Sequence, residues 1–290
     1  MRQLHNHLLF TILPFTPYLF IIYHISHMNI LVTGASNGIG FEIAKLAAAK
    51  GHTVIAVSRN EKRLSDAVDT LRSVAKNAQV HPIAVDLSDQ QGPLFVFKSV
   101  EKLGLTVDCL VNNAGVGTAG RFEEISMDSH MQLLRLNIVA LTQLTHFFLT
   151  DMKERGRGKI LNIASTAAFH PGPFMATYYA SKAYVLSFSE GLREELKSSG
   201  VTVTTLCPGP TNTGFAKTAS VQDLEIFKDQ NMAEAKTVAR IGFDGMMNGA
   251  GVVVVGASNQ LLAAASRIFP TSITSRIMAR LQSSKIKRAS

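Results

Sequence analysis

Residues 33–40 read Thr33-Gly34-Ala35-Ser36-Asn37-Gly38-Ile39-Gly40, and they join a short apolar run to a helical pattern that begins at Ile39. Glycines at such a junction permit a tight turn and let another molecule approach the backbone closely. The free amides at a helix N-terminus favour an anion such as a pyrophosphate. A glycine-rich turn without a ligand would not explain three glycines at one strand-to-helix junction. The segment therefore predicts a dinucleotide-binding βα unit.

The chain from Met28 onward alternates short β-branched runs with longer helical stretches, which is typical of repeated βαβ units around a parallel sheet. The short runs are apolar throughout, as in strands that are buried on both faces. Strands are predicted at 30–33, 53–58, 80–85, 109–112, 159–164, 201–207 and 252–255. Helices are predicted at 39–50, 61–76, 92–103, 129–155, 176–199 and 233–247. The expected fold class is α/β: a Rossmann-type doubly wound parallel seven-stranded sheet in a single domain, residues 28–258.

Composition places the 290-residue chain among globular proteins, because 46% of its residues are hydrophobic and 17% are charged. The net charge of +8 is concentrated in residues 267–290, which hold six Lys or Arg residues and no Asp or Glu. Nucleic-acid binding is therefore not expected. The two cysteines, Cys109 and Cys207, lie in apolar runs that resemble strands, which argues against disulfides and favours a reducing cytoplasm. No metal site is expected.

Each end of the chain leaves two interpretations open. Residues 1–27 form an apolar extension that is either a membrane anchor or the product of a mis-assigned start codon, since Met28 directly precedes the first strand. Residues 259–290 form a basic amphipathic tail. This tail either lies on an anionic membrane surface or packs on the domain or on a second subunit. We therefore expect a cytoplasmic protein, with membrane contact through either end as the alternative to a fully soluble state.

The end of the second predicted strand indicates which dinucleotide the chain uses. An acidic residue at this place accepts a hydrogen bond from the ribose 2′-hydroxyl of NAD(H). Residues 57–60 instead read Val57-Ser58-Arg59-Asn60, and the Arg59 guanidinium can pair with the 2′-phosphate of NADP(H). We predict NADP(H) as the cofactor, with NAD(H) less favoured. A solvated arginine at the start of a helix is the alternative.

Tyr178 and Lys182 lie four residues apart near the start of a predicted helix, so they share one face of it. An ammonium group near a phenol stabilises the phenolate and makes the phenol a usable acid/base near neutral pH. Tyr179 is expected to point elsewhere. Ser165 follows the fifth predicted strand, where its hydroxyl can hydrogen-bond a carbonyl oxygen. Each of these residues alone would be ordinary in a folded protein. It is their occurrence in this order after the 33–40 loop that predicts catalysis.

These motifs together resemble the classical short-chain dehydrogenase/reductase family over about residues 28–258. They are the 33–40 loop, Asp86, Asn112-Asn113-Ala114-Gly115, Asn137, Ser165, Tyr178, Lys182 and Pro208-Gly209-Pro210-Thr211-Asn212-Thr213. The resemblance implies an enzyme that transfers hydride between nicotinamide and a small carbonyl or alcohol substrate. It also implies a homodimer or a homotetramer.

The resemblance further implies a role for each catalytic residue. Tyr178 would be the general acid/base, and Lys182 would bind the nicotinamide ribose and lower the pKa of the tyrosine. Ser165 would position the substrate oxygen, and Asn137 would hold a water in a proton relay. The implied cofactor-binding residues are Thr33, Gly34, Ser36, Asn37, Gly38, Ile39, Gly40, Ser58, Arg59, Asp86, Leu87, Asn113, Ala114, Gly115, Asn137, Tyr178, Lys182, Pro208, Gly209, Thr211 and Thr213.

Four phenylalanines near the expected substrate site predict an apolar pocket for a hydrophobic, lipid-like carbonyl compound. They are Phe169, Phe174, Phe215 and Phe227. His170 either contacts the substrate or is an ordinary loop histidine. Residues 209–231 break the rhythm of strands and helices and predict a substrate lid, with a surface excursion as the alternative.

Two other functions fit a dinucleotide fold. An extended epimerase or dehydratase acting on sugar nucleotides would have one residue fewer before the last glycine of the loop and a larger C-terminal domain, and this sequence has neither feature. A non-catalytic dinucleotide-binding module need not keep a tyrosine, a lysine and a serine together. Both are less favoured than the oxidoreductase.

Overall fold

The computed structural model describes residues 27–75, 78–215, 232–266 and 271–286. Seven parallel strands form one sheet in the order β3-β2-β1-β4-β5-β6-β9. Their bounds are β1 Asn29–Thr33, β2 Thr53–Ser58, β3 Val80–Ala84, β4 Cys109–Asn112, β5 Gly158–Ile163, β6 Val201–Cys207 and β9 Val252–Val254. The prediction of a doubly wound, seven-stranded parallel sheet is confirmed, and each strand end lies within one residue of its predicted place.

The strand order reverses beside β1. The chain adds β2 and β3 on one side of β1 and then returns to add β4, β5, β6 and β9 on the other side. Ile30 of β1 accordingly pairs with Val54 on one side and with Cys109 on the other. The connections that leave β1 and β4 therefore diverge, which opens a crevice at the carboxyl ends of these two strands.

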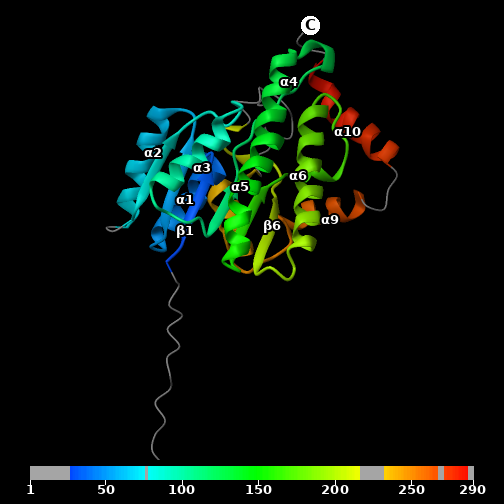
Figure 1. The fold of residues 1–290 in the computed structure, drawn as a ribbon. Helices are drawn as coiled ribbons and strands as arrows, with labels where there is room; N and C mark the ends of the chain where they lie inside the picture. Colours follow the sequence, from blue (N-terminus) through cyan, green and yellow to red (C-terminus); the bar gives the residue numbers. More distant parts are fainter. Residues whose placement is uncertain (1–26, 76–77, 216–231, 267–270, 287–290) are drawn as a thin grey trace, which may run out of the picture.

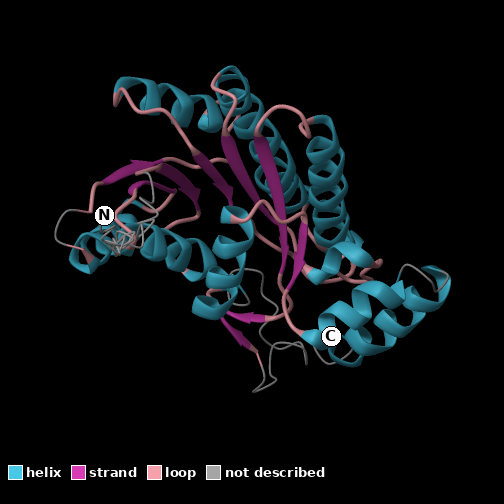
Figure 2. Cartoon of the chain, turned by 90° about the horizontal axis from the view of Figure 1, so that it is seen from below, coloured by secondary structure: helices cyan, strands magenta, loops and turns pink. Residues whose placement is uncertain are grey.

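Helices cover both faces of the sheet (Figures 1 and 2). One face carries α1 Gly38–Ala49, α2 Glu61–Val74 and α8 Ala235–Met247, and the other carries α3 Gly92–Lys102, α5 Leu141–Glu154 and α6 Ala176–Glu195. Alternate side chains of each strand enter the two cores. In β2, Val54 and Ala56 pack with α1 and α2, whereas Ile55 and Val57 pack with α3 and α5. Burial on both faces explains why the strands are apolar throughout.

The helix predicted at 129–155 is a longer composite of α4 Met127–Leu134, the π-helical turn η2 Arg135–Ala140, and α5. It begins earlier than predicted because the Ser126 hydroxyl accepts a hydrogen bond from Ser129 N at 3.3 Å and caps it. Within the described residues it is the one helix that is long and apolar enough to cross a membrane. Its inner side chains, such as Leu144 and Phe148, belong to the core of the domain. The predicted apolar extension falls almost entirely on residues 1–26, outside the described part of the chain.

Short elements and the C-terminal helices were not predicted as such. Ala233–Glu234 forms β8, which pairs with β7 Thr211–Asn212, so the helix predicted from residue 233 begins at Ala235. The 3₁₀ turns η1 Phe122–Glu124 and η3 Thr166–Phe169 follow β4 and β5. The segment interpreted as an amphipathic tail folds into α9 Ala257–Ser266 and α10 Thr271–Ile286.

His52, next to β2, is a buried polar residue without a hydrogen-bond partner among the described residues. Only 1% of it is exposed, and neither ring nitrogen is satisfied. Burial lowers the pKa of its imidazole, and nearby His27 and Lys50 lower it further. The unfolded chain therefore binds this proton more readily than the folded chain, and stability is lost as the pH falls below the usual histidine value of 6.5.

We expect His52→Leu to raise the free energy of unfolding by about 1 kcal/mol at a pH of about 8, because an unsatisfied buried group is removed. At a pH of about 5 the gain should be larger, because the variant has no imidazole to protonate on unfolding. Urea denaturation at the two pH values measures both gains. His146→Leu, an exposed position on α5, is the matched control. A gain of the same size at both pH values would contradict the titration argument.

Candidate active site

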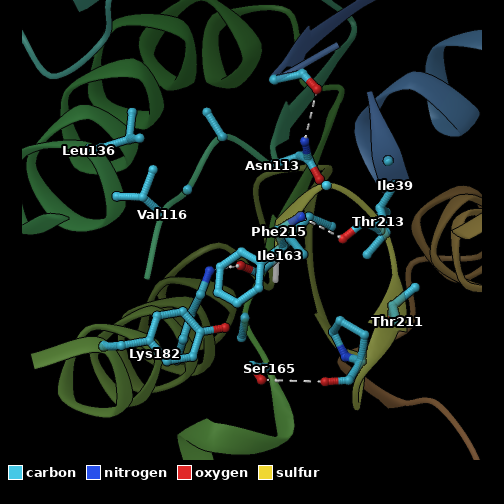
Figure 3. Close-up of a pocket in the computed structure, with 18 of the residues that line it drawn as sticks. Ile39, Asn113, Val116, Leu136, Ile163, Ser165, Lys182, Thr211, Thr213 and Phe215 are labelled. Atoms are coloured by element: carbon cyan, nitrogen blue, oxygen red, sulfur yellow. Dashed lines mark hydrogen bonds between the residues drawn. The ribbon is translucent and has the colours of Figure 1, made fainter. Parts of the chain in front are cut away.

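A cavity of about 460 Å³ lies along the edge of the sheet where its strands end (Figure 3). Loops after β1, β2, β3, β4, β5 and β6 all contribute to its lining. It spans the reversal between β1 and β4, where open α/β sheets bind ligands. Its volume lies within the range of about 300–1,000 Å³ that is usual for small-molecule sites.

The glycine loop forms one end of this cavity. Gly34 and Gly38 have φ values of 66° and 57°, which a residue with a Cβ atom rarely adopts. Asn37 precedes α1 but its side chain makes no capping hydrogen bond, so the first amides of α1 are left for another acceptor. Ser36, Asn37, Gly38 and Ile39 all line the cavity. An uncapped helix N-terminus that opens into a cavity fits the diphosphate of a dinucleotide.

Thr33 and Asn113 join the ends of β1 and β4. The Thr33 hydroxyl accepts hydrogen bonds from the backbone amides of Asn113 at 2.9 Å and Ala114 at 3.0 Å, and donates to Val111 O at 3.2 Å. In return, Asn113 Nδ2 donates to Thr33 O at 2.9 Å and to Gly34 O at 3.3 Å. Gly40 packs against the same amide, where a Cβ atom would collide with it. These contacts hold the two loops of the crevice at a fixed separation.

Basic and hydroxyl side chains line the cavity beside the end of β2. Arg59 and Arg63 lie there with Ser36 and Ser58, whose hydroxyl oxygens are 2.8 Å apart and hydrogen-bonded. Arg59 Nη1 lies 3.6 Å from Asp86 Oδ2, and 53% of the Arg59 side chain is exposed. Two guanidinium groups and two hydroxyls next to the glycine loop form a set of donors suited to a phosphate.

Asp86 is held in place by Ser88. Its Oδ1 atom accepts hydrogen bonds from Ser88 N at 2.8 Å and Ser88 Oγ at 2.7 Å. Burial acts to raise the pKa of the Asp86 carboxyl, but these hydrogen bonds and the charge of Arg59 outweigh burial, so the pKa lies below its usual value. Asp86 is therefore an anion at neutral pH that orients the Arg59 guanidinium.

Tyr178, Lys182 and Ser165 line the other part of the same cavity (Figure 3). Lys182 Nζ lies 5.8 Å from the centroid of the Tyr178 ring and donates a hydrogen bond to Ile163 O at 2.9 Å. Ser165 follows β5, and its Oγ atom accepts a hydrogen bond from Ala167 N at 3.1 Å. The fifth strand and the first turns of α6 thus bring the three predicted side chains together.

Burial shifts the pKa of both titratable members of this group. It raises the pKa of the Tyr178 phenol well above its usual value, and a hydrogen bond with Ser165 acts against this. It lowers the pKa of Lys182 to about 8. At neutral pH the phenol is therefore protonated and the lysine is largely cationic. The group has a proton to donate and a positive charge 5.8 Å from the centroid of the ring that carries it.

Asn137 does not line the cavity but holds one of its walls. It lies in the π-helical turn η2, an irregularity that is frequent at functional sites. Its Oδ1 atom accepts a hydrogen bond from Val116 N at 3.0 Å, and its Nδ2 atom donates to Val116 O at 2.9 Å and to Ser181 Oγ at 3.0 Å. The Ser181 hydroxyl in turn donates to Tyr178 O at 2.7 Å. Asn137 thus connects the β4 loop to the helix that carries the tyrosine.

The cavity wall near Tyr178 is mostly apolar. Val116, Met175, Phe215 and Met278 line it and belong to one apolar cluster with Tyr178, and Leu136 and Leu262 line the same cavity. His170 also lines this part, and burial lowers the pKa of its imidazole. The walls therefore favour a ligand that is apolar around its reacting group.

The aromatic residues differ from their predicted places. Of the four phenylalanines, only Phe215 is among the cavity residues that the structure describes. Phe169 packs on a core cluster, and Phe174, with a left-handed φ of 65°, lines a separate small pocket of about 20 Å³. Phe227 and residues 216–231 of the predicted lid lie outside the described residues. Tyr179 was expected to point away, yet it lines the cavity beside Tyr178.

Comparison with known proteins assigns the chain to a family. The family model for short chain dehydrogenases matches residues 28–224. Ketoacyl reductase HetN from Nostoc sp. (strain PCC 7120) is 31% identical over 252 residues, which cover 84% of this chain and 86% of the relative. The chain belongs to the short-chain dehydrogenase/reductase family. It is therefore an oxidoreductase of the short-chain type.

Solved structures share the fold of this dehydrogenase. A short-chain dehydrogenase from Sphingobium yanoikuyae in complex with NADPH is 28% identical, with a TM-score of 0.75 over 83% of this chain and 93% of that one. A short-chain dehydrogenase/reductase from Burkholderia phymatum in complex with NAD has the same TM-score of 0.75 at 24% identity, over 84% and 94% of the two chains, which shows the fold alone. These two neighbours hold different nicotinamide dinucleotides, so the likeness in fold does not decide between NADP(H) and NAD(H) for this chain.

Most of the predicted site residues of this dehydrogenase surround the cavity. Those that line it are Gly34, Ser36, Asn37, Gly38, Ile39, Ser58, Arg59, Asp86, Leu87, Asn113, Ala114, Gly115, Ser165, Tyr178, Lys182, Pro208, Gly209, Thr211 and Thr213. Thr33, Gly40 and Asn137 lie behind it and support the lining. Sequence reasoning missed other lining residues, among them Arg63, Leu136, Met175, Asn259, Leu262 and Met278. Arg63 could have been found, because it lies in the first turn of the helix that follows Arg59.

Lys182 of this dehydrogenase is a buried cation, only 6% exposed. Its burial lowers the free energy of unfolding. Its pKa is about 8 in the folded chain against a usual 10.5, so the unfolded chain binds more protons between these two values. Stability therefore rises as the pH climbs from about 8 towards 10.5 and is lowest below 8.

We expect Lys182→Met to raise the free energy of unfolding by about 2 kcal/mol at neutral pH, because the apolar side chain needs no hydration. The gain should shrink as the pH rises towards 10.5, where the folded wild type also carries a neutral amine. Urea denaturation across this range measures it. Lys159→Met is the matched control, since Lys159 also donates to a backbone carbonyl, Met247 O, from a part-exposed position. A destabilised Lys182→Met protein would overturn the expectation.

Proposed function

We propose that this chain is an NADP(H)-dependent oxidoreductase that interconverts a hydrophobic carbonyl compound and its alcohol. The observation that carries the proposal is that one cavity holds both the group of Tyr178, Lys182 and Ser165 and the glycine loop beside Arg59. A carbonyl reduction needs a bound nicotinamide, a proton donor and a site that excludes water. This cavity supplies residues for each requirement.

The bound cofactor supplies or accepts the hydride, and the chain's own residues handle the proton and the oxygen. The Tyr178 phenol donates its proton to the carbonyl oxygen as negative charge develops there, and takes it back in the reverse direction. The Ser165 hydroxyl, which donates to Pro208 O at 3.4 Å in the structure, turns to donate a hydrogen bond to the same oxygen. The Lys182 ammonium, near the Tyr178 ring, favours the phenolate that remains, and it also has hydrogens to donate to the cofactor ribose.

We propose that Asn137 acts mainly by holding the substrate wall. Both hydrogens of its side-chain amide are already donated, to Val116 O and to Ser181 Oγ. The side chain therefore ties the wall to the helix that carries Tyr178. Its role in holding a relay water stays a prediction.

Selection of NADP(H) over NAD(H) rests on Arg59. Its guanidinium is oriented by the anionic Asp86 and lies near Arg63 and two serine hydroxyls. A 2′-phosphate next to the glycine loop would accept charge-assisted hydrogen bonds from this group. The 2′-hydroxyl of NAD(H) carries no charge, so the Arg59 guanidinium contributes much less to the binding of NAD(H).

The apolar wall favours a bulky, lipid-like carbonyl substrate. Val116, Leu136, Met175 and Met278 offer no hydrogen bond to a polar substrate, and burying a polar group against them is unfavourable. The relative from Nostoc sp. is named a ketoacyl reductase, which is consistent with a carbonyl on an acyl chain. We propose a substrate of this class.

We further propose that the enzyme works in the cytoplasm as a homodimer or a homotetramer. Cys109 and Cys207 are free and buried, as expected for a protein that uses no disulfides. The oligomeric state follows from family membership alone.

We expect Arg59→Ala to weaken NADPH binding by about 10- to 100-fold, the loss of a charge-assisted interaction with the phosphate, and to leave NADH binding nearly unchanged. Quenching or enhancement of nicotinamide fluorescence on titration measures both affinities. Lys62→Ala removes a neighbouring exposed cation that does not line the cavity, and it serves as the control. Equal losses of affinity for NADPH and NADH would contradict the assignment of NADP(H) as the cofactor.

We expect Tyr178→Phe to lower kcat for ketone reduction by about 10²- to 10⁴-fold, the usual contribution of general acid catalysis, while NADPH affinity is retained. Steady-state kinetics and the fluorescence titration give the two readouts. The control is Tyr184→Phe, which removes a hydroxyl on the same helix that is hydrogen-bonded to Thr142 Oγ1 at 2.9 Å, away from the cavity. Retention of wild-type turnover by Tyr178→Phe would show that another group donates the proton.

A further inference from the structure

His170 follows the 3₁₀ turn η3, five residues after Ser165 in the chain. Near the start of this turn, Ala167 N donates a hydrogen bond to Ser165 Oγ, so the turn is tied to the residue that would hold the substrate oxygen. His170 is half-buried and lines the same cavity as Ser165 and Tyr178. A short, hydrogen-bonded segment therefore places an imidazole in the wall of the proposed active site.

Neighbouring rings hold this imidazole in place. The ring centroids of His170 and Tyr179 lie 5.5 Å apart, and those of Tyr179 and Tyr178 lie 6.0 Å apart. Tyr179 is only 6% exposed, and the backbone at Gly172 lies so close to its ring that a Cβ atom there would collide with it. The Tyr179 ring is thus closely packed, and two successive ring contacts connect the imidazole to the phenol that is proposed to donate the proton.

The hydrogen bond of the His170 ring identifies the nitrogen that carries its hydrogen. Nδ1 lies 3.4 Å from Pro171 O, and because a carbonyl oxygen can only accept, the hydrogen belongs to Nδ1. Burial lowers the pKa of the imidazole, and the bond to Pro171 O opposes this only in part, so the ring is neutral at neutral pH. Nε2 then has a lone pair and no hydrogen. Among the residues that the structure describes, none donates a hydrogen bond to it.

The surroundings of His170 make an acceptor without a partner unfavourable. The wall near Tyr178 is otherwise mostly apolar and includes Met175, Phe215 and Met278. When a ligand displaces water from such a wall, a buried acceptor that stays unpaired costs free energy, whereas a paired acceptor gives a net gain. A site of this kind distinguishes a ligand that carries a hydrogen-bond donor from an analogue that lacks it.

We propose that His170 determines substrate specificity, its Nε2 atom accepting a hydrogen bond from a hydroxyl group of the substrate. This inference rests on the proposed function, and it narrows the substrate class to hydrophobic ketones that carry a hydroxyl group at a distance from the reacting carbonyl. The carbonyl lies at Tyr178 and Ser165, an apolar body contacts the wall, and the hydroxyl reaches the imidazole. An ether, a second carbonyl or a carboxylate at the same place has no hydrogen to donate and gains nothing from Nε2.

Matched ketones test this contact. The probes are methyl ketones with a straight chain of about six to twelve carbons, each in three forms: with a hydroxyl at the far end, with a methyl ether there, and with neither. kcat/KM with NADPH is measured for each form on wild type, His170→Phe and His146→Phe. Phenylalanine keeps a planar ring and removes the acceptor. His146 is exposed on α5 and does not line the cavity, so its substitution is the matched control.

The decisive quantity is the ratio of kcat/KM for the hydroxyketone to that for its methyl ether, at the chain length for which the wild-type ratio is highest. We expect this ratio to fall by about 3- to 10-fold in His170→Phe, the loss of one hydrogen bond. His146→Phe should keep the wild-type ratio. A ratio that His170→Phe leaves unchanged at every chain length would overturn the proposal. An equal loss of turnover for all three forms would also overturn it, since the ring would then be merely structural.

The dependence of this ratio on pH is a second readout. Below its lowered pKa the imidazole gains a hydrogen on Nε2 and donates to hydroxyl and ether alike. The wild-type ratio should therefore fall as the pH drops below the usual histidine value of 6.5, whereas the His170→Phe ratio should stay constant. A wild-type ratio that did not fall in acid would contradict the assignment of Nε2 as an acceptor.

Other titratable groups near His170 do not obscure this readout. Tyr179 of α6 packs on the imidazole, and Tyr178 and Lys182 of the same helix line the cavity. The helix α9, which contacts η3, holds no titratable side chain. Because Tyr178 and Lys182 act on the carbonyl end that all three ketones share, their titration cancels in the ratio.

Failure of the proposed function would be recognised separately. If the wild type reduced none of the ketones with NADPH, the assignment of the reaction would fail. The affinity of the same ketones for the protein with NADPH, measured by isothermal titration calorimetry, would still decide the role of His170. Weaker binding of the hydroxyketone to His170→Phe than to wild type, with the methyl ether unaffected, would support the contact, and equal affinities would exclude it.

Discussion

Parallel pairing of β1 with both β2 and β4 is the constraint on which the rest of this molecule depends. Because all seven strands run in the same direction, every one of them ends at the same edge, and every connection must return across a face of the sheet. The returning helices bury both faces and fix the two cores. The strand ends, in contrast, are left to loops. Those loops carry the glycines, the arginines, the serine and the tyrosine helix that together surround one cavity.

The groups that the chemistry of the cavity requires lower the stability of the folded protein. A phenol and an ammonium group are both buried beside apolar walls, where the charged form of each is disfavoured. Only one hydrogen bond of Lys182, to Ile163 O, is found among the described contacts. The surrounding sheet tolerates this because its strands and helices bury many side chains completely. Rigid scaffolding thus permits an arrangement of groups that a looser protein would rearrange.

The sheet could be predicted well from the sequence, because strands buried on both faces are continuously apolar and loops rich in glycine mark their ends. The cavity residues near the dinucleotide loop followed from the same reasoning. The residues of the substrate wall could not be predicted from the sequence in this way. The direction of a phenylalanine depends on backbone geometry, as the left-handed φ of Phe174 illustrates, and Met278 reaches the cavity only because α10 folds back against α6. The pairing of β7 with β8 is similarly invisible, since two-residue strands have no periodicity.

The hydroxyl of Thr33 also constrains how the chain reaches its native alignment. It serves two amides and one carbonyl on the β4 side, and only 1% of the residue is exposed. A slip of β4 by a single position would turn its apolar side chains to the wrong core and leave these polar groups buried without partners. A valine at position 33 has the same shape and would fit the space, but it would no longer favour the correct register of β4 over a shifted one. The Thr33 hydroxyl oxygen therefore gives the correct pairing of β1 with β4 a lower free energy than a shifted pairing, before any cofactor is bound.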